Sequence, residues 1–214
     1  MSVDIHHIDN KRMIDCQHNA DGQYLFVNIS KNASTSIRES IFFTDYSPYK
    51  DIKGVEGYIK FTVWRNPISR VVSSFYEIRD IRSDGPYYVT MRMKWYRERN
   101  LFKSFELFID EINNNFYDAH SFPQVTFLND KGLGIDDMDE ILLLETIQED
   151  YNRLIKKYPY IVSNNLMHLQ SHKNDTLMNY VYNNVDIKDK IIKLYQEDYN
   201  IYLRLKERNE FRNS

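Results

Sequence analysis

The chain contains three short apolar segments, each followed by a polar turn and then by an amphipathic stretch. These segments are residues 24–29 (YLFVNI), 58–64 (YIKFTVW) and 140–144 (EILLL). Continuous apolar runs of this length are typical of strands that are buried on both faces of a parallel sheet. Because such strands alternate here with helical stretches, we predict an α/β fold with a central parallel sheet flanked by helices.

Two of the predicted helices carry a possible capping box at their start. Ser36 with Glu39, and Thr146 with Glu149, have the spacing at which a hydroxyl and a carboxylate cap each other's backbone N–H groups. We therefore expect a helix to begin at each of these hydroxyl residues.

The helix after the second predicted strand has the clearest boundary. Asn66 is a favourable N-cap, and Pro67 is a favourable first helical residue. Further helices are predicted at 104–113 and 186–206. The apolar positions after Pro67 recur at helical spacing and predict a buried stripe of Ile68, Val71, Val72, Phe75 and Ile78.

Glycine and proline are scarce, whereas aromatic residues are abundant. The 214 residues include 6 Gly and 5 Pro, but 17 Tyr, 12 Phe and 2 Trp. This composition excludes collagen-like and low-complexity proteins. The six glycines form neither G-x-G-x-x-G nor G-x-x-x-x-G-K-[ST], so any phosphate site must be built without glycine.

Charge and cysteine content narrow the class of protein further. The net charge of −3 provides no overall field for nucleic acid or an anionic membrane, so we expect neither as a partner. Cys16 is the only cysteine, which excludes an intrachain disulfide, and the polar N-terminus carries no signal-like apolar stretch. We expect a soluble cytoplasmic protein with one domain over 1–214, whose core spans about 22–205 between peripheral tails.

The polar segment after the first predicted strand combines a cation with three hydroxyl groups. A helix start offers free N–H groups and positive partial charge, and small residues let the backbone approach a phosphate where glycine is missing. A simple helix cap is the alternative interpretation of the hydroxyl residues. The candidate phosphate-binding residues are Lys31, Asn32, Ala33, Ser34, Thr35 and Ser36.

The polar segment after the second predicted strand places Arg65 at the strand end and Ser73 about two helical turns further on. A guanidinium can bind a phosphate through two N–H groups, and Arg70 and Glu77 lie on the helical face of Ser73. The alternative is an arginine paired with an acid and a serine on a solvated face. Because ligands bind at the carboxyl ends of parallel strands, we expect both polar segments to face one crevice.

Together the two segments resemble the paired cofactor motifs of sulfotransferases that use 3′-phosphoadenosine 5′-phosphosulfate (PAPS). YLFVNISKNASTSI is similar to the 5′-phosphosulfate loop in the Lys-x-Ala-x-Thr-Ser form of the carbohydrate sulfotransferase branch. FTVWRNPISRVVSSFY resembles the 3′-phosphate motif, with Asn66 where the family usually has Asp. The resemblance spans roughly 22–203 and continues, in family order, through KSFELFIDEI, DAHSFPQVTFL, ILLLETIQEDYNRL and IIKLYQEDYNIY.

The resemblance implies a three-layer P-loop-like fold and a role for each phosphate-loop residue. Lys31 would lie at the oxygen that bridges phosphate and sulfate, while the rest of 31–36 would hold the 5′-phosphate. Arg65 and Ser73 would hold the 3′-phosphate, with Arg70 nearby. The family needs no metal. His6 and His7 lie in the polar N-terminus, and His168 and His172 have no obvious carboxylate companion.

An acceptor hydroxyl that attacks sulfur needs a general base. His120 is the first candidate because it lies in a segment that resembles the family and because histidine is the residue most often used as a general base. The alternative interpretation of His120 is a structural loop residue. Many sulfotransferases carry the base between the two phosphate motifs, where Glu56 is the second candidate.

Residues 79–103 contain seven basic residues interleaved with Tyr87, Tyr88, Trp95 and Tyr96. One interpretation is an acceptor groove in which aromatic faces contact sugar rings, and the other is an amphipathic helix with a solvated basic side. We predict a PAPS-dependent sulfotransferase acting on a hydroxyl group of a carbohydrate. The alternatives are a nucleotide or small-metabolite kinase and a non-catalytic nucleotide-binding protein.

Overall fold

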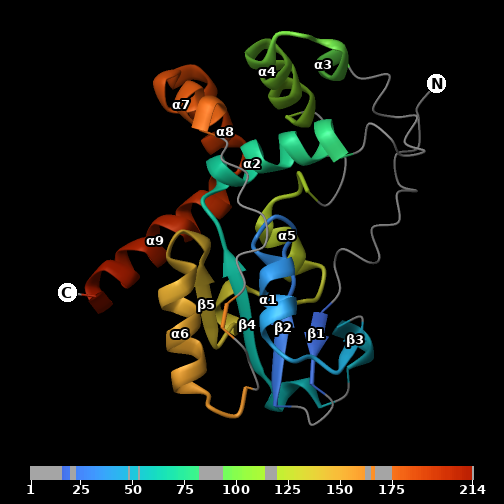
Figure 1. Ribbon diagram of the computed structural model, residues 1–214, viewed down its shortest axis with the longest axis vertical. Coiled ribbons are helices and arrows are strands. Elements are labelled where there is room, and N and C mark those ends of the chain that lie inside the picture. Colours follow the sequence, from blue (N-terminus) through green and yellow to red (C-terminus); the bar gives the residue numbers. More distant parts are fainter. Residues whose placement is uncertain are drawn as a thin grey trace.

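A computed structural model gives the fold (Figure 1) and describes residues 16–19, 23–47, 49–52, 54–81, 94–113, 120–161, 165–166 and 175–213. Within these residues a five-stranded sheet has the order β3-β1-β2-β4-β5. The strands are β1 (Cys16–His18), β2 (Tyr24–Val27), β3 (Asp45–Ser47), β4 (Ile59–Trp64) and β5 (Glu140–Leu143).

The three strands predicted from apolar runs form the parallel part of the sheet. β4 is central and pairs in parallel with β2 on one side, where Phe26 faces Phe61, and with β5 on the other, where Trp64 faces Leu143. The prediction of a parallel sheet is therefore confirmed for these strands. The edge formed by β1 and β3 is antiparallel and was not predicted.

Helices cover both faces of the sheet because side chains alternate along each strand. On one face Phe26 and Phe61 pack with α1 (Ser34–Ser40) and α6 (Ile147–Lys157). On the other face Leu25 and Val27 pack with α5 (Gln124–Asn129) and α9 (Gln196–Asn213). This arrangement confirms the predicted α/β class with a sheet between helical layers.

A further group of helices lies beyond the carboxyl end of β4, in the upper part of Figure 1. The buried stripe predicted after Pro67 is confirmed, since each of its five residues is at most 2 % exposed and belongs to this second core: Ile68, Val71, Val72, Phe75 and Ile78. The group consists of α2 (Pro67–Tyr76), α3 (Lys94–Arg97), α4 (Leu101–Ile112), α7 (Asp175–Asn183) and α8 (Val185–Leu194).

None of the helices in the described parts of the chain is long and apolar enough to cross a membrane.

Helix boundaries test the capping predictions. Asn66 caps α2 as expected, because its side chain accepts a hydrogen bond from the N–H of Ile68 at 2.9 Å. The capping box at Ser36 is wrong, since α1 begins earlier and follows Ala33 without a side-chain cap. The box at Thr146 does not form either, because the Thr146 hydroxyl donates to Asp150 at 3.2 Å instead.

The last predicted helix, 186–206, is two helices in the structure. α8 ends at Leu194, Tyr195 leaves the helical conformation, and α9 then begins at Gln196. The predicted helix at 104–113 begins earlier, at Leu101, because Asn100 caps it by accepting from the N–H of Lys103 at 3.0 Å.

Candidate functional site

The two polar segments predicted to bind phosphates lie side by side at the carboxyl ends of β2 and β4. Hydrogen bonds join them directly, since Arg65 donates from Nη1 to the carbonyl of Lys31 at 2.9 Å. Arg70 donates from Nε to the carbonyl of Ser30 at 3.0 Å. The structure therefore brings the loop after β2 and the start of α2 together at one edge of the sheet.

The loop after β2 makes its turn without glycine. Lys31 has a φ of 69° and Ala33 a φ of 55°, so both adopt the left-handed conformation that residues with a side chain rarely adopt. Each such residue costs roughly 1–2 kcal/mol. Local hydrogen bonds to the carbonyl of Ile29 hold the turn, from the N–H of Asn32 at 3.3 Å and from the hydroxyl of Ser34 at 2.9 Å.

The side chain of Lys31 points toward α2 and forms an ion pair there. Its Nζ lies 3.0 Å from a carboxylate oxygen of Glu77, and the two side chains are 15 % and 20 % exposed. Glu77 is the first residue of a short π-helix, Glu77–Ile81, that continues α2. π-Helical turns occur frequently at functional sites. The sequence placed Glu77 on the face of Ser73, but nothing in it indicated that Lys31 would be the partner.

Arg65 is held at the end of β4 by hydrogen bonds rather than by an acid. Besides the bond to Lys31, its Nε donates to the hydroxyl of Ser69 at 3.0 Å. Among the described residues no carboxylate lies within ion-pair distance of it. Burial lowers the pKa of Arg65 to about 10, with Glu145 opposing this shift and Arg70 adding to it. Arg65 is therefore still a cation at neutral pH.

Glu145 lies just after the end of β5 and contacts the residue that follows Arg65. Its carboxylate accepts a hydrogen bond from the backbone N–H of Asn66 at 3.0 Å. Burial raises the pKa of this carboxyl above its ordinary value, although the bond from Asn66 and the charge of Arg65 oppose the shift. The start of α2 is therefore held by two contacts of Asn66: its N–H donates to Glu145, and its side chain accepts from the N–H of Ile68.

Arg70 is buried more deeply than the sequence suggested. It is 1 % exposed, and its Nη1 donates to the carbonyl of Phe122 at 2.6 Å in addition to the bond to Ser30. The guanidinium also lies over the ring of Phe127, 5.8 Å from its centre. Arg70 therefore joins the loop after β2 to the segment that precedes α5.

The two candidate bases occupy different places. His120 is buried, and its carbonyl accepts a hydrogen bond from the hydroxyl of Ser74, the residue after Ser73, at 2.5 Å. Glu56 is exposed on a short 3₁₀ turn, Val55–Gly57, directly before β4. A strand of six residues spans about 20 Å, so Glu56 lies at the opposite edge of the sheet from Arg65. The structure brings His120 toward the phosphate segments but not Glu56.

Several further predicted features lie outside the described residues. These include His6, His7, His168 and His172, as well as most of the basic segment with Tyr87 and Tyr88. Trp95 is described and is fully buried between Phe75 and Phe108, so it packs in the core and presents no face to a sugar. Within the described ranges no cluster of three or more His, Cys, Asp or Glu could hold a metal ion.

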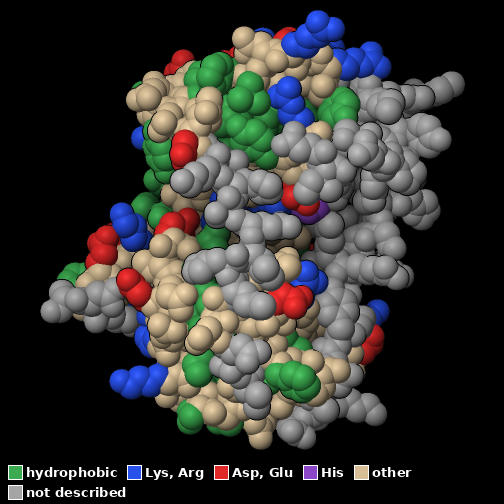
Figure 2. All heavy atoms as spheres, viewed as in Figure 1, with side chains coloured by type: hydrophobic (Ala, Val, Ile, Leu, Met, Phe, Trp, Pro, Cys, Tyr) green, Lys and Arg blue, Asp and Glu red, His purple; other side chains and the backbone are tan. Residues whose placement is uncertain are grey.

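The site suits a ligand with two separated anionic groups. Lys31 and Arg65 supply one cation from each loop, and Ser34, Thr35 and Ser73 supply partly or fully exposed hydroxyl-bearing side chains. Figure 2 shows charged side chains of both signs on the face of the molecule that is seen in Figure 1. This chemistry fits a nucleotide with phosphates at both ends of its ribose.

Comparison with known proteins identifies the family. Residues 27–203, from the end of β2 to the middle of α9, match the sulfotransferase family and include both phosphate segments and His120. No curated protein and no solved structure matches the chain. Given the extent of the family match, the chain belongs to the sulfotransferase family, whose enzymes transfer a sulfuryl group from PAPS.

Proposed function

We propose that the protein transfers the sulfuryl group of PAPS to a hydroxyl group of a carbohydrate. The observation that carries this proposal is the hydrogen bond from Arg65 to the carbonyl of Lys31, which joins the two cationic loops at neighbouring strand ends. PAPS supplies an activated sulfuryl group and leaves as 3′,5′-ADP. The carbohydrate acceptor is supported by the Lys-x-Ala-x-Thr-Ser form of the first loop.

The two loops divide the binding of the donor between them. Residues 31–36 hold the 5′-phosphate, and the ammonium of Lys31 stabilises the negative charge that develops on the leaving oxygen. Arg65 and Ser73 hold the 3′-phosphate. Arg70 supports them, since it fixes the carbonyls of Ser30 and Phe122. Positioning and charge stabilisation are the main requirements of an in-line group transfer.

His120 takes the proton of the acceptor hydroxyl in this proposal. Its support is the position of the residue, buried beside α2 with its carbonyl bonded to Ser74. Glu56 has no comparable support, because it lies before β4, at the other end of the strand from Arg65.

Ligand-dependent unfolding temperatures test donor binding. We expect 3′,5′-ADP, but not ATP with Mg²⁺, to raise the unfolding temperature by several degrees at about 100 times its Kd. Stabilisation by ATP with Mg²⁺ alone would favour a kinase.

Substitution of Lys31 tests catalysis separately from binding. Lys31→Ala is expected to bind 3′,5′-ADP within about tenfold of wild type but to lose at least about 10²-fold in sulfuryl transfer, because charge on the leaving oxygen is no longer stabilised. Labelled PAPS and a panel of sugars provide the assay. Lys156→Ala, an exposed position on α6, is the matched control and should transfer normally. Equal transfer by Lys31→Ala and the control would argue against the role of Lys31.

The role of His120 is tested by the pH dependence of transfer. His120→Ala is expected to lower turnover at least about 10²-fold and to remove the limb of the kcat profile that reports the base. His18→Ala, at a buried histidine on β1, is the matched control. A normal turnover and profile in His120→Ala would show that another group takes the proton.

A further inference from the structure

A glutamine between the two phosphate loops joins them more completely than either arginine does. Gln124, the first residue of α5, is fully buried. Its Oε1 accepts from the backbone N–H of Arg65 at 3.0 Å, and its Nε2 donates to the carbonyl of Arg65 at 3.0 Å. The carboxamide therefore pairs with both backbone groups of Arg65, as a neighbouring strand would.

The same carboxamide reaches the other loop. Oε1 of Gln124 also accepts from Nδ2 of Asn32 at 2.6 Å, and Nδ2 of Asn32 donates further to the carbonyl of Val63 at 2.7 Å. Asn32 is fully buried and lies between the two left-handed residues Lys31 and Ala33. Fixing its side chain thus fixes the centre of the glycine-free turn.

The backbone of Gln124 is itself held from α9. Asp198 is fully buried, and its carboxylate accepts from the N–H of Gln124 at 2.6 Å and from the N–H of Val125 at 3.0 Å. The backbone of Gln124 is therefore held in place, and its carboxamide contacts both loops. Hydrogen-bonded buried networks rigidify the groups they join, and Oδ1 of Asn32 is the one atom of these carboxamide and carboxylate groups that is buried without a partner among the described residues.

We propose that Gln124 is a positioning residue that sets the spacing of Lys31 and Arg65, so that both cations reach one donor molecule. This inference rests on the proposed function, because it assumes that the two loops bind the two ends of PAPS. A displacement of about 1 Å can cost roughly 10²-fold in rate or binding when two groups must meet one ligand. Without Gln124, each loop would bind its own phosphate but the two would no longer cooperate.

The test compares two nucleotides that differ only in the 3′-phosphate. The ratio of the Kd for 5′-AMP to the Kd for 3′,5′-ADP measures what Arg65 adds once the 5′-phosphate is bound. Gln124→Met keeps the length of the side chain but removes the carboxamide, and we expect it to lower this ratio at least tenfold. Calorimetry at a temperature where circular dichroism shows a folded protein provides both constants.

Ser104→Ala is the matched control for loss of a buried hydrogen bond. The Ser104 hydroxyl donates to the carbonyl of Trp95 at 2.5 Å in the helical layer, away from both loops. This variant should lose stability and keep the wild-type ratio. Asn32→Ala breaks the network from the loop side, so it should lower the ratio as well and be non-additive with Gln124→Met.

The possible outcomes separate this inference from the proposed function. A wild-type ratio in folded Gln124→Met would overturn the positioning role. If Gln124→Met does not fold, a wild-type ratio in Asn32→Ala would overturn it instead. A wild-type protein that binds neither nucleotide would contradict the proposed function, whereas a lowered ratio in both variants but not in Ser104→Ala supports the inference.

Discussion

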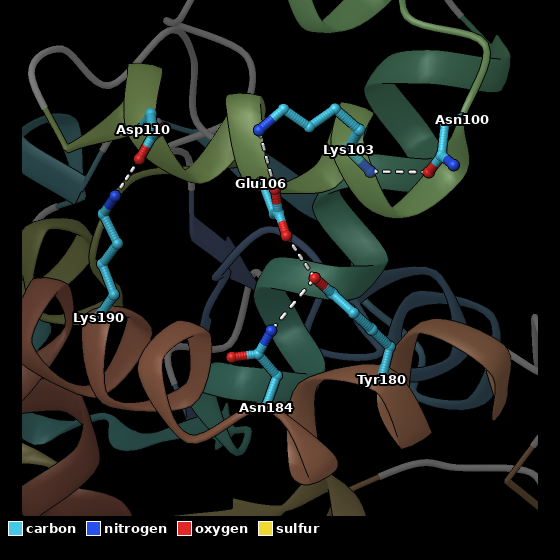
Figure 3. Close-up of polar contacts among 7 residues, drawn as sticks. All are labelled: Asn100, Lys103, Glu106, Asp110, Tyr180, Asn184 and Lys190. Atoms are coloured by element: carbon cyan, nitrogen blue, oxygen red, sulfur yellow. Dashed lines mark hydrogen bonds and ion pairs between the residues drawn. The ribbon is translucent and has the colours of Figure 1, made fainter.

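Two polar regions of this molecule use hydrogen bonds for different purposes. At the loop end of the sheet, the side chains of Arg65, Arg70 and Gln124 bond mainly to backbone groups, and Arg70 and Gln124 are almost completely buried. On the surface where α4 meets α7 and α8, side chains bond to one another (Figure 3). Glu106 is central there and accepts from Tyr180 at 2.5 Å and from Lys103 at 3.1 Å.

The difference lies in what holds the backbone when the polar groups are removed. Beneath the surface network of Figure 3, Phe75, Phe105 and Phe108 pack with their ring centres 5.3–6.4 Å apart. This apolar packing holds the helices together without the polar contacts. In the loop after β2, neither Lys31 nor Ala33 belongs to an apolar cluster of the described residues, although Ile29 before the turn and Ile37 after it do. Its left-handed residues are held by hydrogen bonds to carbonyls, so we expect substitutions there to cost more.

The largest effect on stability is expected for Arg70→Met. The change leaves the carbonyls of Ser30 and Phe122 without their donor, and it removes the positive charge that offsets the buried carboxylate of Asp198. We expect a loss of about 3–5 kcal/mol in the free energy of unfolding, measured in urea. Arg38→Met, at an exposed arginine of α1, should cost less than about 1 kcal/mol. Similar losses in the two variants would remove the contrast between buried and exposed cations.

A smaller effect is expected at Ala33, where the backbone rather than a charge is strained. Ala33→Val places a β-branched side chain in the left-handed region and should cost about 1–2 kcal/mol. Ala33→Gly should be nearly neutral, because relief of strain is offset by roughly 0.5–1 kcal/mol of chain entropy. Thermal unfolding checks both variants.

Gly54 supplies the matched control for Ala33. It has a φ of +67°, and an added Cβ would meet nothing within 4 Å, so Gly54→Ala measures the cost of a left-handed alanine by itself. We expect that cost to be about 1 kcal/mol. A clear gain in stability for Ala33→Val would contradict the idea that hydrogen bonds hold this turn against strain.

Local sequence patterns predicted the parts of the fold that depend on neighbouring residues. The apolar runs gave β2, β4 and β5, and the pair Asn66 and Pro67 gave the start of α2. β1 and β3 could not be found in this way, because each has only three residues and β3 is fixed by its pairing with β1, which lies far from it in the sequence.

The candidate site was predictable in its loops but not in the contacts between them. Arg65 stands out because it is a cation directly after β4, and Lys31 because it is the cation of the polar loop that follows β2. Their partners are remote in sequence, since Lys31 and Glu77 are 46 positions apart and Arg65 and Gln124 are 59 positions apart. Local patterns carry no information on such pairs. The capping box predicted at Ser36 does not form, because α1 begins at Ser34, directly after the left-handed Ala33, so Ser36 lies inside the helix.

The smallest effect is expected in the surface network, for Glu106→Gln. The hydrogen bond from Tyr180 lowers the pKa of Glu106 below its ordinary value of 4.5, and burial opposes this shift. A lowered pKa means that the stabilising contribution is present above about pH 4.5 and is lost as the pH falls through the folded-state value. We expect Glu106→Gln to cost less than about 1 kcal/mol at pH 7, with the difference from wild type vanishing at an acidic pH below the folded-state pKa of Glu106. Urea unfolding at both pH values provides the measurement, and a loss above about 2 kcal/mol at pH 7 would show that this exposed network holds its helices as the buried one holds its loops.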